Sequence, residues 1–598
     1  MELKRLFDLL DYRKETQPDR AVFVAKQNGE WHKVFIDEYI DKVNKISYAL
    51  LHRGLQKGDK VALISADRPE WNFVDMAVQQ IGCVLVPIYP TISLEDYHFI
   101  LTNSEVKCIF LDTESLLKKL KGVLSGLENL KDIVMFSELK TPEEYADIAA
   151  VRPIVSFAEM LQLGEAYANP EKVQELKDSI QTRDVATMIY TSGTTGFPKG
   201  VMLCHENILV NIHGVEHTPK PYFTRAMSFL PLCHIYERMM NYFYQYMGYE
   251  TYYAENVGKV VENMKYARPY MMTAVPRFIE KMYDGIYRKG EKMKGLKKKI
   301  FYWSLSLATK YDLDGTSWWY KIRRQWADVL VYHQIRESFG GCLEMFVSGG
   351  SAIQPRLARF FSCVGMNIYE GYGLTETAPV IAVSSAAPHG RKLGTAGLPL
   401  PGIEVKILED SNEIVCRGKN VMLGYYKNPE QTALAIDSEG WFHTGDTGAF
   451  EPEGQLRITG RTKTMFKTSM GKFVNPEVLE EKFKESPFIL DMMVVGENQK
   501  FAAAIIVPDF NFLKDWQKRH GISCATQDEM VHDKKTLARF RKVVDKYNKQ
   551  FGATEQIKKY VVINDVWDVQ NGCLTPTLKI KRAVISERCK KEIEGLFA

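Results

Sequence analysis

Short apolar runs that end in a polar or glycine turn, each followed by a helical pattern, recur along this chain. Residues 60–90, KVALISADRPEWNFVDMAVQQIGCVLVPIYP, predict a strand, a helix and a strand, with Asp67 as the helix cap and Pro69 in the first turn. The runs VATMIYTSG, AMSFLPL, YMMTAVP and LEMFVSGG repeat the strand-to-turn pattern. Repeated β-then-α units favour a parallel, doubly wound α/β sheet that binds ligands beyond the carboxyl ends of its strands.

After about Gly460 the pattern changes. Charged helices such as NPEVLEEKFKES surround the short strands MMVVG, AAAIIVPD and YVVIND. This predicts a large domain over 1–460 and a small α+β domain over 461–598, joined at ITGRTKTMFK.

Charge and cysteine usage exclude some classes of partner and compartment. The chain of 598 residues has 78 basic and 74 acidic residues, and this balance argues against a nucleic-acid partner. Ten cysteines without a CxxC pair indicate reduced thiols. The N-terminus lacks a signal-peptide pattern, and no apolar run reaches the ~18 residues of a spanning helix. We expect a cytoplasmic protein, with peripheral contact at the inner face of a membrane left open.

The stretch YTSGTTGFPKG, residues 190–200, combines glycines, hydroxyls and a lysine after an apolar strand. Such a turn can bring backbone N–H groups and an ammonium close to a polyphosphate. It is not a Walker A loop, because Pro198 precedes Lys199 and Gly200 follows it. Taken alone, a plain linker is an equally good interpretation.

Five further motifs follow in order: SGGSA (348–352), EGYGLTE (370–376), TGD (444–446), GRTK (460–463) and LTPTLKIKR (574–582). With the opening loop they resemble the adenylate-forming superfamily of acyl-CoA synthetases, luciferases and peptide-synthetase adenylation domains. LPLCHIYER, AVPRFIEKMY and FKTSMGKFVNPE are similar to long-chain fatty acyl-CoA synthetases. The resemblance implies a large N-terminal domain of doubly wound mixed sheets with a β-barrel-like subdomain, and a small mobile α+β C-terminal domain.

The resemblance also implies a role for each motif in binding MgATP. The β- and γ-phosphates would be held by Thr191, Ser192, Gly193, Thr194, Thr195, Gly196 and Lys199. Mg²⁺ would bind Glu376 with Thr191, as suits a hard cation. The adenine slot would consist of Gly349, Gly350, Glu370, Gly371 and Tyr372. Thr375 would contact the α-phosphate, and Asp446 with Arg461 the ribose.

Residues of the small domain are implied to move during the reaction. Lys579 resembles the catalytic lysine that bridges the substrate carboxylate and ATP. Lys581 is close, and the spacing from Lys579 to Arg582 decides between them, although Leu578 stands where many relatives have glycine. Lys463 would be the hinge. Lys467 would meet AMP, and Gly471 and Lys472 would meet CoA.

Two features remain open between a functional and a structural interpretation. His234 in PLCHIYER carries no fixed negative charge, so it suits a gate for an acyl chain, whereas the alternative is a structural histidine. The segment 291–320 places Lys297, Lys298 and Lys299 beside Phe301, Tyr302, Trp303, Trp318 and Trp319. Basic and aromatic residues suit an anionic membrane, and the alternative is a helix packed on the main domain.

The expected reaction converts a long-chain fatty acid, ATP and CoA into acyl-CoA, AMP and pyrophosphate through an acyl-adenylate. The alternative is an adenylation enzyme that loads an acyl or aryl acid onto a separate carrier protein. Preferred chain length and the oligomeric state, monomer or homodimer, are not predicted.

Overall fold

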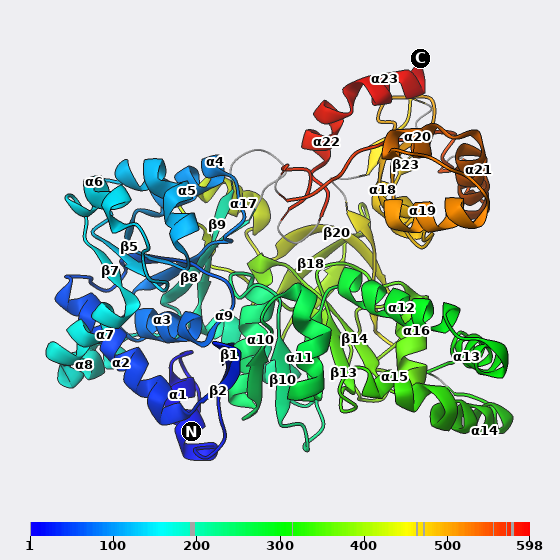
Figure 1. The fold of residues 1–598 in the computed structure, drawn as a ribbon. Coiled ribbons are helices and arrows are strands. Elements are labelled where there is room, and N and C mark those ends of the chain that lie inside the picture. The colour runs from blue at the N-terminus through cyan, green and yellow to red at the C-terminus, as the bar shows by residue number, and fades with distance from the viewer. Residues whose placement is uncertain are drawn as a thin grey trace.

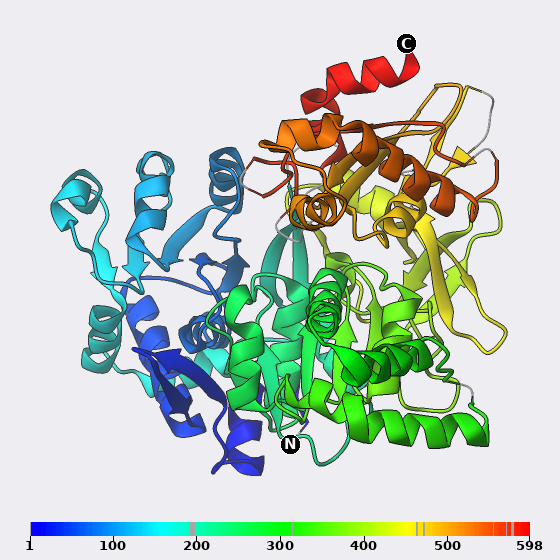
Figure 2. The same ribbon diagram turned by 45° about the vertical axis from the view of Figure 1, so that its right-hand side comes forward.

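The computed structural model describes residues 2–191, 198–313, 315–461, 465–469, 473–553, 555–569, 571–575 and 579–598. Two large sheets form the N-terminal part of the chain (Figure 1). The blue and cyan lobe holds one sheet and the green lobe holds most of the other. A small domain, orange and red, lies above the green lobe in Figures 1 and 2.

The first sheet has nine strands in the described residues, in the order β16-β15-β14-β13-β12-β10-β11-β1-β2. Strands β14 to β1 run parallel, and β2, β15 and β16 pair antiparallel. Their bounds are β1 Phe23–Gln27, β2 Glu30–Val34, β10 Arg225–Ser228, β11 Glu250–Tyr253, β12 Met271–Ala274, β13 Met345–Ser348, β14 Asn367–Tyr372, β15 Ala382–Val383 and β16 Leu398–Pro399.

The second sheet has eight strands over the described part of the chain, in the order β19-β9-β8-β4-β3-β5-β6-β7. Strands β8 to β7 are parallel, and β9 and β19 pair antiparallel at one edge. Their bounds are β3 Lys60–Ile64, β4 Val84–Pro87, β5 Val106–Leu111, β6 Asp132–Met135, β7 Ile154–Ser156, β8 Val185–Thr191, β9 Lys199–Cys204 and β19 Gly424–Tyr425.

Helices α3 (Pro69–Gln80), α9 (His205–Val215) and α10 (Ile235–Tyr246) pack between these two sheets. Trp71, Ile208 and Tyr242 from these helices share one core with Leu85 of the second sheet and Met271 of the first. Almost every residue of α3 and α10 is buried, as expected for helices covered on all sides. This buried layer places the first residues of α10 at the carboxyl ends of the first sheet's strands.

The remaining helices before the small domain flank the two large sheets. A second core joins the first sheet to α11, α12, α13 and α16, and a third joins the second sheet to α4 and α5. Their bounds are α1 Asp8–Thr16, α2 Ile36–His52, α4 Leu94–Ser104, α5 Glu114–Ser125, α6 Ala146–Ala149, α7 Phe157–Ala166, α8 Pro170–Ser179, α11 Val260–Ala267, α12 Pro276–Glu291, α13 Gly295–Ala308, α14 Trp318–Ala327, α15 His333–Glu337, α16 Pro355–Val364 and α17 Pro429–Ala435. Shorter turns are η1 Pro142–Tyr145, η2 Val257–Lys259, the π-helix η3 Asp328–Tyr332 and η4 Thr375–Thr377.

The subdomain expected to resemble a barrel is a four-stranded antiparallel sheet in the order β17-β18-β20-β21. Its bounds are β17 Glu404–Ile407, β18 Glu413–Arg417, β20 Phe442–Phe450 and β21 Leu456–Arg461. The two edge strands, β17 and β21, do not pair with each other in the described residues, so the sheet is open. Its strands β20 and β21 lead toward the small domain.

The small domain has its own sheet and its own cores. Strands β24 (Ile489–Val495), β25 (Ala503–Pro508) and β26 (Lys559–Val562) form one sheet, and β22 (Phe466–Lys467) pairs with β23 (Phe473–Val474). Alternate residues of β25 face opposite sides, so Ile506 joins one core and Ile505 the other. The helices are α18 Pro476–Phe483, α19 Phe510–Arg519, α20 Gln527–His532, α21 Lys534–Asn548, α22 Arg582–Arg588 and α23 Lys590–Phe597.

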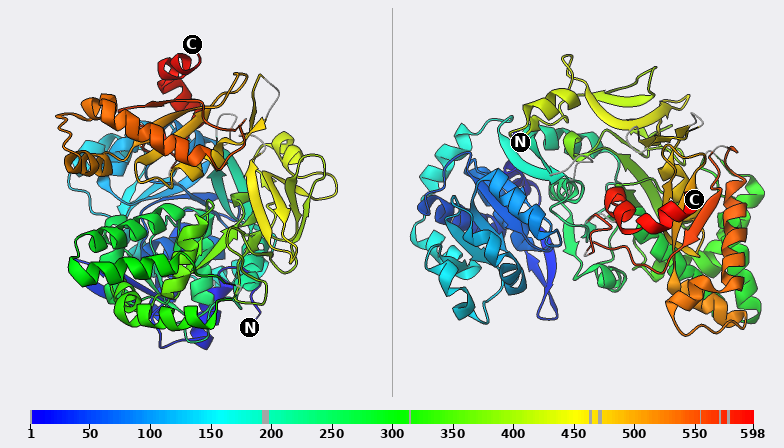
Figure 3. Two further views of the ribbon diagram at one scale, coloured as in Figure 1. Left: turned by 90° about the vertical axis from the view of Figure 1, so that its right-hand side faces the viewer. Right: turned by 90° about the horizontal axis from the view of Figure 1, so that it is seen from above.

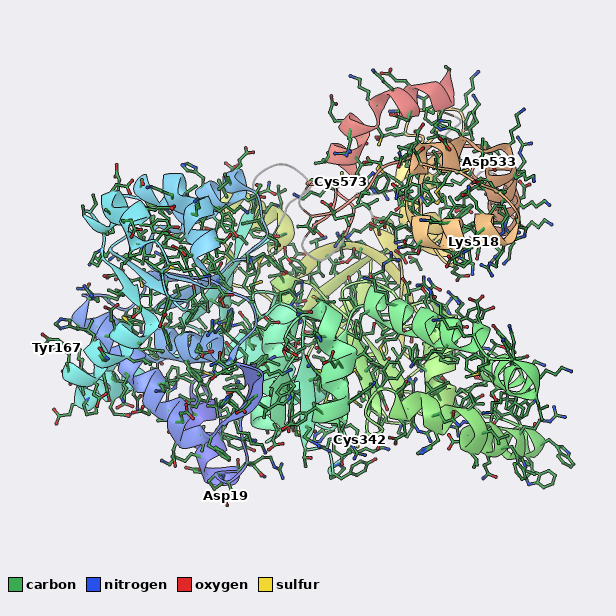
Figure 4. The ribbon with its side chains drawn as sticks, viewed as in Figure 1. Asp19, Tyr167, Cys342, Lys518, Asp533 and Cys573 are labelled. Carbon is green, nitrogen blue, oxygen red and sulfur yellow. The ribbon has the colours of Figure 1, made fainter. Side chains whose placement is uncertain are left out.

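The small domain lies over one side of the large domain, as the view from above in Figure 3 shows. Lys518 and Asp533 lie on it in Figure 4, whereas Tyr167 lies at the far end of the large domain. Burial raises the pKa of Asp491 in β24, and the nearby Arg277 of α12 opposes this shift. Helix α12 therefore faces the small domain across the interface.

The strand–helix–strand prediction for residues 60–90 is confirmed by β3, α3 and β4, with Pro69 in the first turn. The predicted cap is wrong. Arg68 is the residue at the cap position, and the Asp67 carboxylate accepts a hydrogen bond from the backbone N–H of Leu232 at 2.8 Å. Asp67 thus ties this turn to the segment before α10.

The ten cysteines all lie among the described residues and are free thiols, as predicted. Across the same residues, none of the helices combines the length and the apolar composition needed to cross a bilayer.

Candidate active site

The predicted phosphate loop is held by an antiparallel hairpin. Strands β8 and β9 pair with Thr191 opposite Lys199 and Tyr190 opposite Gly200. The residues between them, Ser192, Gly193, Thr194, Thr195 and Gly196, lie outside the described residues. The hairpin therefore places the Thr191 and Lys199 side chains at the two ends of the predicted loop.

Lys199 and Glu376 meet at one residue that the sequence analysis did not identify, Tyr425 of β19. The Tyr425 hydroxyl donates to Glu376 Oε1 at 2.9 Å, and the Lys199 ammonium lies 4.9 Å from the centre of its ring. Lys199 Nζ also donates to Gln431 Oε1 at 2.6 Å. One tyrosine thus contacts a cation with its ring and an anion with its hydroxyl, and both charges suit a metal-bound polyphosphate.

Thr375 and Glu376 form the short helix η4, which follows β14 and Gly373. The backbone N–H of Met422 donates to the Glu376 carbonyl at 2.8 Å, and this bond fixes η4 against the segment that leads into β19. Both side chains are half-buried, so they remain accessible to a ligand.

Gly349 and Gly350, predicted for the adenine slot, directly follow β13. A Cβ atom on Gly349 would lie 3.2 Å from the Tyr236 ring, closer than most side chains tolerate. Gly350 has a φ of +86°, a conformation that favours glycine. The Tyr236 hydroxyl donates to the Val347 carbonyl at 2.7 Å, which holds its ring beneath the glycine turn. Because these two glycines have no side chains, a flat ring can approach the end of β13 closely.

The neighbouring strand β14 carries Glu370, Gly371 and Tyr372. Burial raises the pKa of Glu370 to about 7, and hydrogen bonds from the backbone of Ile353 and Gly394 oppose this shift. Glu370 lies opposite Ser348 in the parallel register, so β13 and β14 end side by side. These strand ends lie where doubly wound sheets bind nucleotides.

Tyr372, Asp446 and Arg461 form a hydrogen-bonded group. The Tyr372 hydroxyl donates to Asp446 Oδ2 at 2.9 Å, and Arg461 Nε donates to Oδ1 at 2.6 Å. Asp446 and Arg461 are directly opposite each other in the β20–β21 ladder. Burial opposes the charge of Arg461, yet its pKa is raised because Asp446 is so close. The predicted ribose pair and the predicted adenine residue are therefore in direct contact.

Lys579 of the small domain is hydrogen-bonded to Thr575, four positions before it. Its backbone N–H donates to the Thr575 hydroxyl at 3.0 Å, and the Thr575 N–H donates to the Lys579 carbonyl at 2.7 Å. Arg582, three positions after Lys579, is anchored to the small domain, because its guanidinium donates to the buried Glu480 of α18 at 2.5 Å. In the Lys-x-x-Arg spacing, Lys579 is therefore the exposed lysine, and Arg582 is the arginine that anchors the segment to α18.

The Lys579 ammonium faces the large domain. Its side chain reaches solvent, but the surrounding protein lowers its pKa, and Arg461 lowers it further, while Asp446 and Glu477 oppose the shift. The charge of Lys579 also contributes to the lowered pKa of His234. The lysine is thus close enough to interact electrostatically with both the Asp446–Arg461 pair and His234 at the start of α10. Lys581, the alternative, lies at the start of α22, where its N–H donates to the Cys573 carbonyl.

His234 lies at the N-terminus of α10, where its Nδ1 accepts a hydrogen bond from the Tyr236 N–H at 3.2 Å. Burial lowers its pKa to about 4, with a smaller effect from Lys579. The imidazole is therefore neutral at physiological pH. This cap gives His234 a structural role, and its role as a gate for an acyl chain stays a prediction.

The remaining predicted residues are not all placed. Lys463, Gly471 and Lys472 lie outside the described residues. Lys467 is exposed on β22. The hinge and CoA-binding assignments therefore remain predictions.

A buried polar group, which the sequence analysis missed, supports α10 at the site. The Glu237 carboxyl is hydrogen-bonded to the hydroxyls of Ser228 in β10, at 2.5 Å, and Thr273 in β12. Asn241 also donates to Ser228 at 3.1 Å. Glu237 lies within the quoted LPLCHIYER, and its place next to His234 and Tyr236 was the available signal. These bonds fix the α10 N-terminus to two strand ends.

We expect Glu237→Gln to be increasingly stabilised relative to the parent as pH rises from about 5 to 8. Burial raises the pKa of Glu237 from its ordinary 4.5 to about 8. Between these values the folded chain holds a proton that the unfolded chain releases, so the stability of the parent falls as pH rises. Glutamine keeps hydrogen-bonding capacity without titrating. The melting temperatures of both proteins at pH 5 and 8 measure the effect.

The matched control is Glu409→Gln, at an exposed turn. An identical pH trend in the parent, Glu237→Gln and Glu409→Gln would show that Glu237 does not titrate in this way.

Glu376 fits a magnesium ion bound chiefly by a polyphosphate. Mg²⁺ in nucleotide sites takes one or two carboxylates and several oxygens from phosphates and water. Tyr425 uses Oε1 of Glu376, and an oxygen acceptor also has further lone pairs. No group of three or more His, Cys, Asp or Glu suited to a metal occurs among the residues with described positions, so a protein-only cage is not offered there.

Polar groups at the strand ends of a doubly wound domain, with a lysine of a small C-terminal domain nearby, are typical of the class of adenylate-forming enzymes. Residues 10–426 match the family described as AMP-binding enzyme, and residues 464–598 match the AMP-binding enzyme C-terminal domain. The chain therefore belongs to the AMP-binding enzyme family.

Curated relatives show which members of this family the chain is similar to. The long-chain-fatty-acid–CoA ligase FadD15 of Mycobacterium bovis is 30% identical over 588 residues, covering 97% of this chain and 95% of that protein. The peroxisomal long chain acyl-CoA synthetase 6 of Arabidopsis thaliana is 31% identical over 569 residues, covering 92% and 79%. Both agree with the predicted similarity to long-chain acyl-CoA synthetases.

Solved structures show the same fold. The anthranilate CoA ligase AuaEII, in complex with anthranoyl-AMP, has a TM-score of 0.73 at 17% identity, with 99% of this chain and 98% of that chain covered. A fatty acyl CoA synthetase of Mycobacterium tuberculosis has a TM-score of 0.63 at 20% identity, with 98% and 99% covered. Both structures therefore share the fold of this chain over almost its whole length.

Proposed function

We propose that this chain is a long-chain fatty acid–CoA ligase. A carboxylate oxygen of the fatty acid attacks the α-phosphorus of ATP, and pyrophosphate leaves. The CoA sulfur then attacks the acyl carbon of the adenylate, AMP leaves, and the thiol proton is released. The observation that carries the proposal is the position of Lys579, which faces both the Asp446–Arg461 pair and His234.

Each half of the site has a distinct task in the first step. Lys199 attracts the departing pyrophosphate, and Lys579 neutralises negative charge between the fatty acid carboxylate and the α-phosphate. Asp446 and Arg461 orient the ribose. When bound at Glu376 and Thr191, Mg²⁺ would supply further neutralisation of phosphate charge. The fatty acid carboxylate and the ATP phosphates repel each other. The main contribution of Lys199 and Lys579 is to hold these two anions in the correct positions.

The acyl side of the site begins at α10. Neutral His234 offers no carboxylate for an amino-acid ammonium, and Tyr236 places an aromatic surface next to Gly349. Both features suit an apolar acid.

We expect acids of twelve to eighteen carbons to exceed acetate in kcat/KM by about 1000-fold or more, because each buried methylene contributes roughly 0.8 kcal/mol. Amino acids should be equally poor substrates. Thioester formation from ATP and CoA, measured across straight-chain acids from two to twenty carbons, tests this.

Two controls sharpen the acid panel. Replacement of CoA by an acyl carrier protein separates a CoA ligase from a carrier-loading enzyme, since only the latter should prefer the carrier. Similar rates for acetate and palmitate would contradict the long-chain assignment. Adenylate formation without any thioester to CoA would contradict the ligase assignment.

Contact with a membrane follows from the proposed substrate, because long-chain acids partition into bilayers. We propose a cytoplasmic protein that meets the inner face of a membrane. The predicted segment 291–320 is only partly suited to this contact. Phe301 is buried in the core of the large domain and Tyr302 is half-buried, whereas Lys297 and Lys299 are exposed. For α13, packing on the main domain is therefore the better interpretation.

A further inference from the structure

Helix α14 is oriented by the side that it packs against the large domain. The Tyr320 hydroxyl donates to the Leu307 carbonyl at 2.8 Å, and Arg324 Nε donates to the Cys363 carbonyl at 2.9 Å. Ala327 and Val331, one and two turns further, are buried. These four residues define the inner face and leave the opposite face of α14 in solvent.

That opposite face is apolar. Trp318, Trp319 and Trp326 are 64%, 67% and 64% exposed. Val329 and Leu330 of η3, the π-helix that continues α14, are 71% and 43% exposed. Residues 318, 322, 326 and 330 are four apart and therefore follow one stripe. We call Trp318, Trp319, Trp326, Val329 and Leu330 the α14 face.

A helix of a globular protein usually turns its apolar side inward. Single exposed apolar residues are normal, but a contiguous apolar surface marks an interaction site. The inner face of α14 contains a hydrogen-bonded arginine and tyrosine, while the outer face contains three exposed indoles. Packing within the chain therefore does not account for the α14 face.

The surroundings of the α14 face are strongly basic. Residues 292–327 contain nine lysines and arginines and two aspartates. Lys321 and Arg323 are exposed on α14 itself, and Lys297, Lys299 and Lys310 are exposed on or just after the neighbouring α13. Figure 1 places α13 and α14 at the edge of the large domain, below the small domain. Cations thus border an apolar stripe at an accessible edge.

Three kinds of partner can be compared for an apolar α14 face with a basic border. A second copy of the chain would bring two basic surfaces together, which is unfavourable. A single-stranded nucleic acid would stack on indoles, but aliphatic Val329 and Leu330 offer no stacking surface. An anionic bilayer satisfies every part, because tryptophan favours the interface, aliphatic side chains enter the acyl region, and lysines and arginines meet phosphate headgroups.

We propose that the α14 face docks on an anionic lipid surface, with Trp318, Trp319 and Trp326 inserted at the level of the headgroups and the flanking cations on lipid phosphates. Docking would bring the active site close to membrane-dissolved fatty acids, and this benefit rests on the proposed fatty-acid ligase activity. The binding to lipid does not depend on that activity.

The test is co-sedimentation of the full chain with vesicles of phosphatidylcholine, with and without 30% phosphatidylglycerol. Wild-type protein should bind the anionic vesicles, and Trp318→Ala/Trp319→Ala/Trp326→Ala should bind at least about tenfold more weakly. Lys297→Gln/Lys299→Gln should weaken binding to anionic vesicles, as should added salt. Lys298 is left intact because its ammonium donates to the Glu291 carbonyl.

The matched control is Val151→Ala/Tyr167→Ala, which removes two exposed apolar side chains elsewhere on the large domain and should bind as the wild type. Equal vesicle binding by the triple tryptophan variant and the wild type would overturn the proposal, as would absence of wild-type binding. A wild-type dimer that dissociates in the triple variant would assign the face to a second copy. Tighter binding of a single-stranded oligonucleotide than of vesicles, lost in that variant, would assign it to nucleic acid.

Two readouts separate this proposal from the proposed function. Thioester formation from albumin-bound palmitate, without vesicles, should be unchanged in the triple variant. Failure of the wild type to form any thioester would contradict the ligase activity while leaving vesicle binding interpretable.

Discussion

Lys579→Ala should lower acyl-adenylate formation by about 100- to 1000-fold while leaving the conversion of supplied acyl-adenylate to thioester nearly intact. The Lys579 ammonium faces the Asp446–Arg461 pair and His234, where the fatty acid carboxylate and the α-phosphate would meet. Its charge is needed only while two anions approach each other. Fatty-acid-dependent pyrophosphate exchange measures the first half-reaction, and synthetic acyl-adenylate with CoA measures the second.

Lys581→Ala is the matched control, because it removes a lysine two positions away, at the cap position before α22. It should retain pyrophosphate exchange within a few-fold of the wild type. Loss of exchange in Lys581→Ala, with exchange retained in Lys579→Ala, would reverse the assignment of the two lysines.

A substitution at the proposed hinge should have the converse effect. We propose that the small domain, 461–598, rotates about Lys463 between the two half-reactions, so that Lys579 withdraws and the segment with Gly471 and Lys472 approaches CoA. Lys463→Pro should retain pyrophosphate exchange and lose thioester formation, because the fixed φ of proline obstructs the rotation. Loss of the same half-reaction in both lysine variants would contradict a two-position mechanism.

Glu376→Gln should also lower pyrophosphate exchange by about 100-fold. An amide is a poor ligand for Mg²⁺ and leaves polyphosphate charge uncompensated. The fold should be retained, because the amide oxygen can still accept the hydrogen bond that Tyr425 donates to Oε1. Exchange rates over a series of Mg²⁺ concentrations should show that high Mg²⁺ partly restores the variant.

Two variants serve as controls for this site. Tyr425→Phe removes the hydrogen bond but leaves the carboxylate, so it should lose much less activity than Glu376→Gln. Glu404→Gln, at an exposed strand of the four-stranded sheet, should match the wild type. Pyrophosphate exchange at the wild-type rate in Glu376→Gln would show that Glu376 is not a metal ligand.

The local pattern was sufficient to predict much of the fold. β3, α3 and β4 follow from an apolar run, a helical pattern with Pro69 in its first turn, and a second apolar run. Such preferences depend on neighbours within a few residues, so they are visible in the sequence. The prediction that Asp67 caps α3 was wrong, because Asp67 instead accepts a hydrogen bond from the N–H of Leu232. Leu232 is distant in the sequence, so no local pattern could indicate this contact.

The candidate site likewise contains residues that the sequence predicts and residues that only the tertiary structure brings together. Motif order and residue type predicted Lys199, Glu376, Asp446, Arg461 and Lys579 as site residues, and these roles stay predictions. The motifs did not identify Tyr425, which connects Lys199 with Glu376 only because β19 pairs with β9. Glu237 was likewise missed, since its partners Ser228 and Thr273 meet it only when β10 and β12 lie side by side.

By itself, the sequence determined the class of chemistry, the order of the motifs and the alternation of strands and helices, because these depend on residue type and short-range spacing. The tertiary structure alone decided which side chains meet and which face solvent. It buried Phe301 while leaving Trp318 and Trp319 exposed, although all three lie in one aromatic, basic segment. Burial is set by packing against distant elements, here the core around α13 and α16, and no local pattern records that contact.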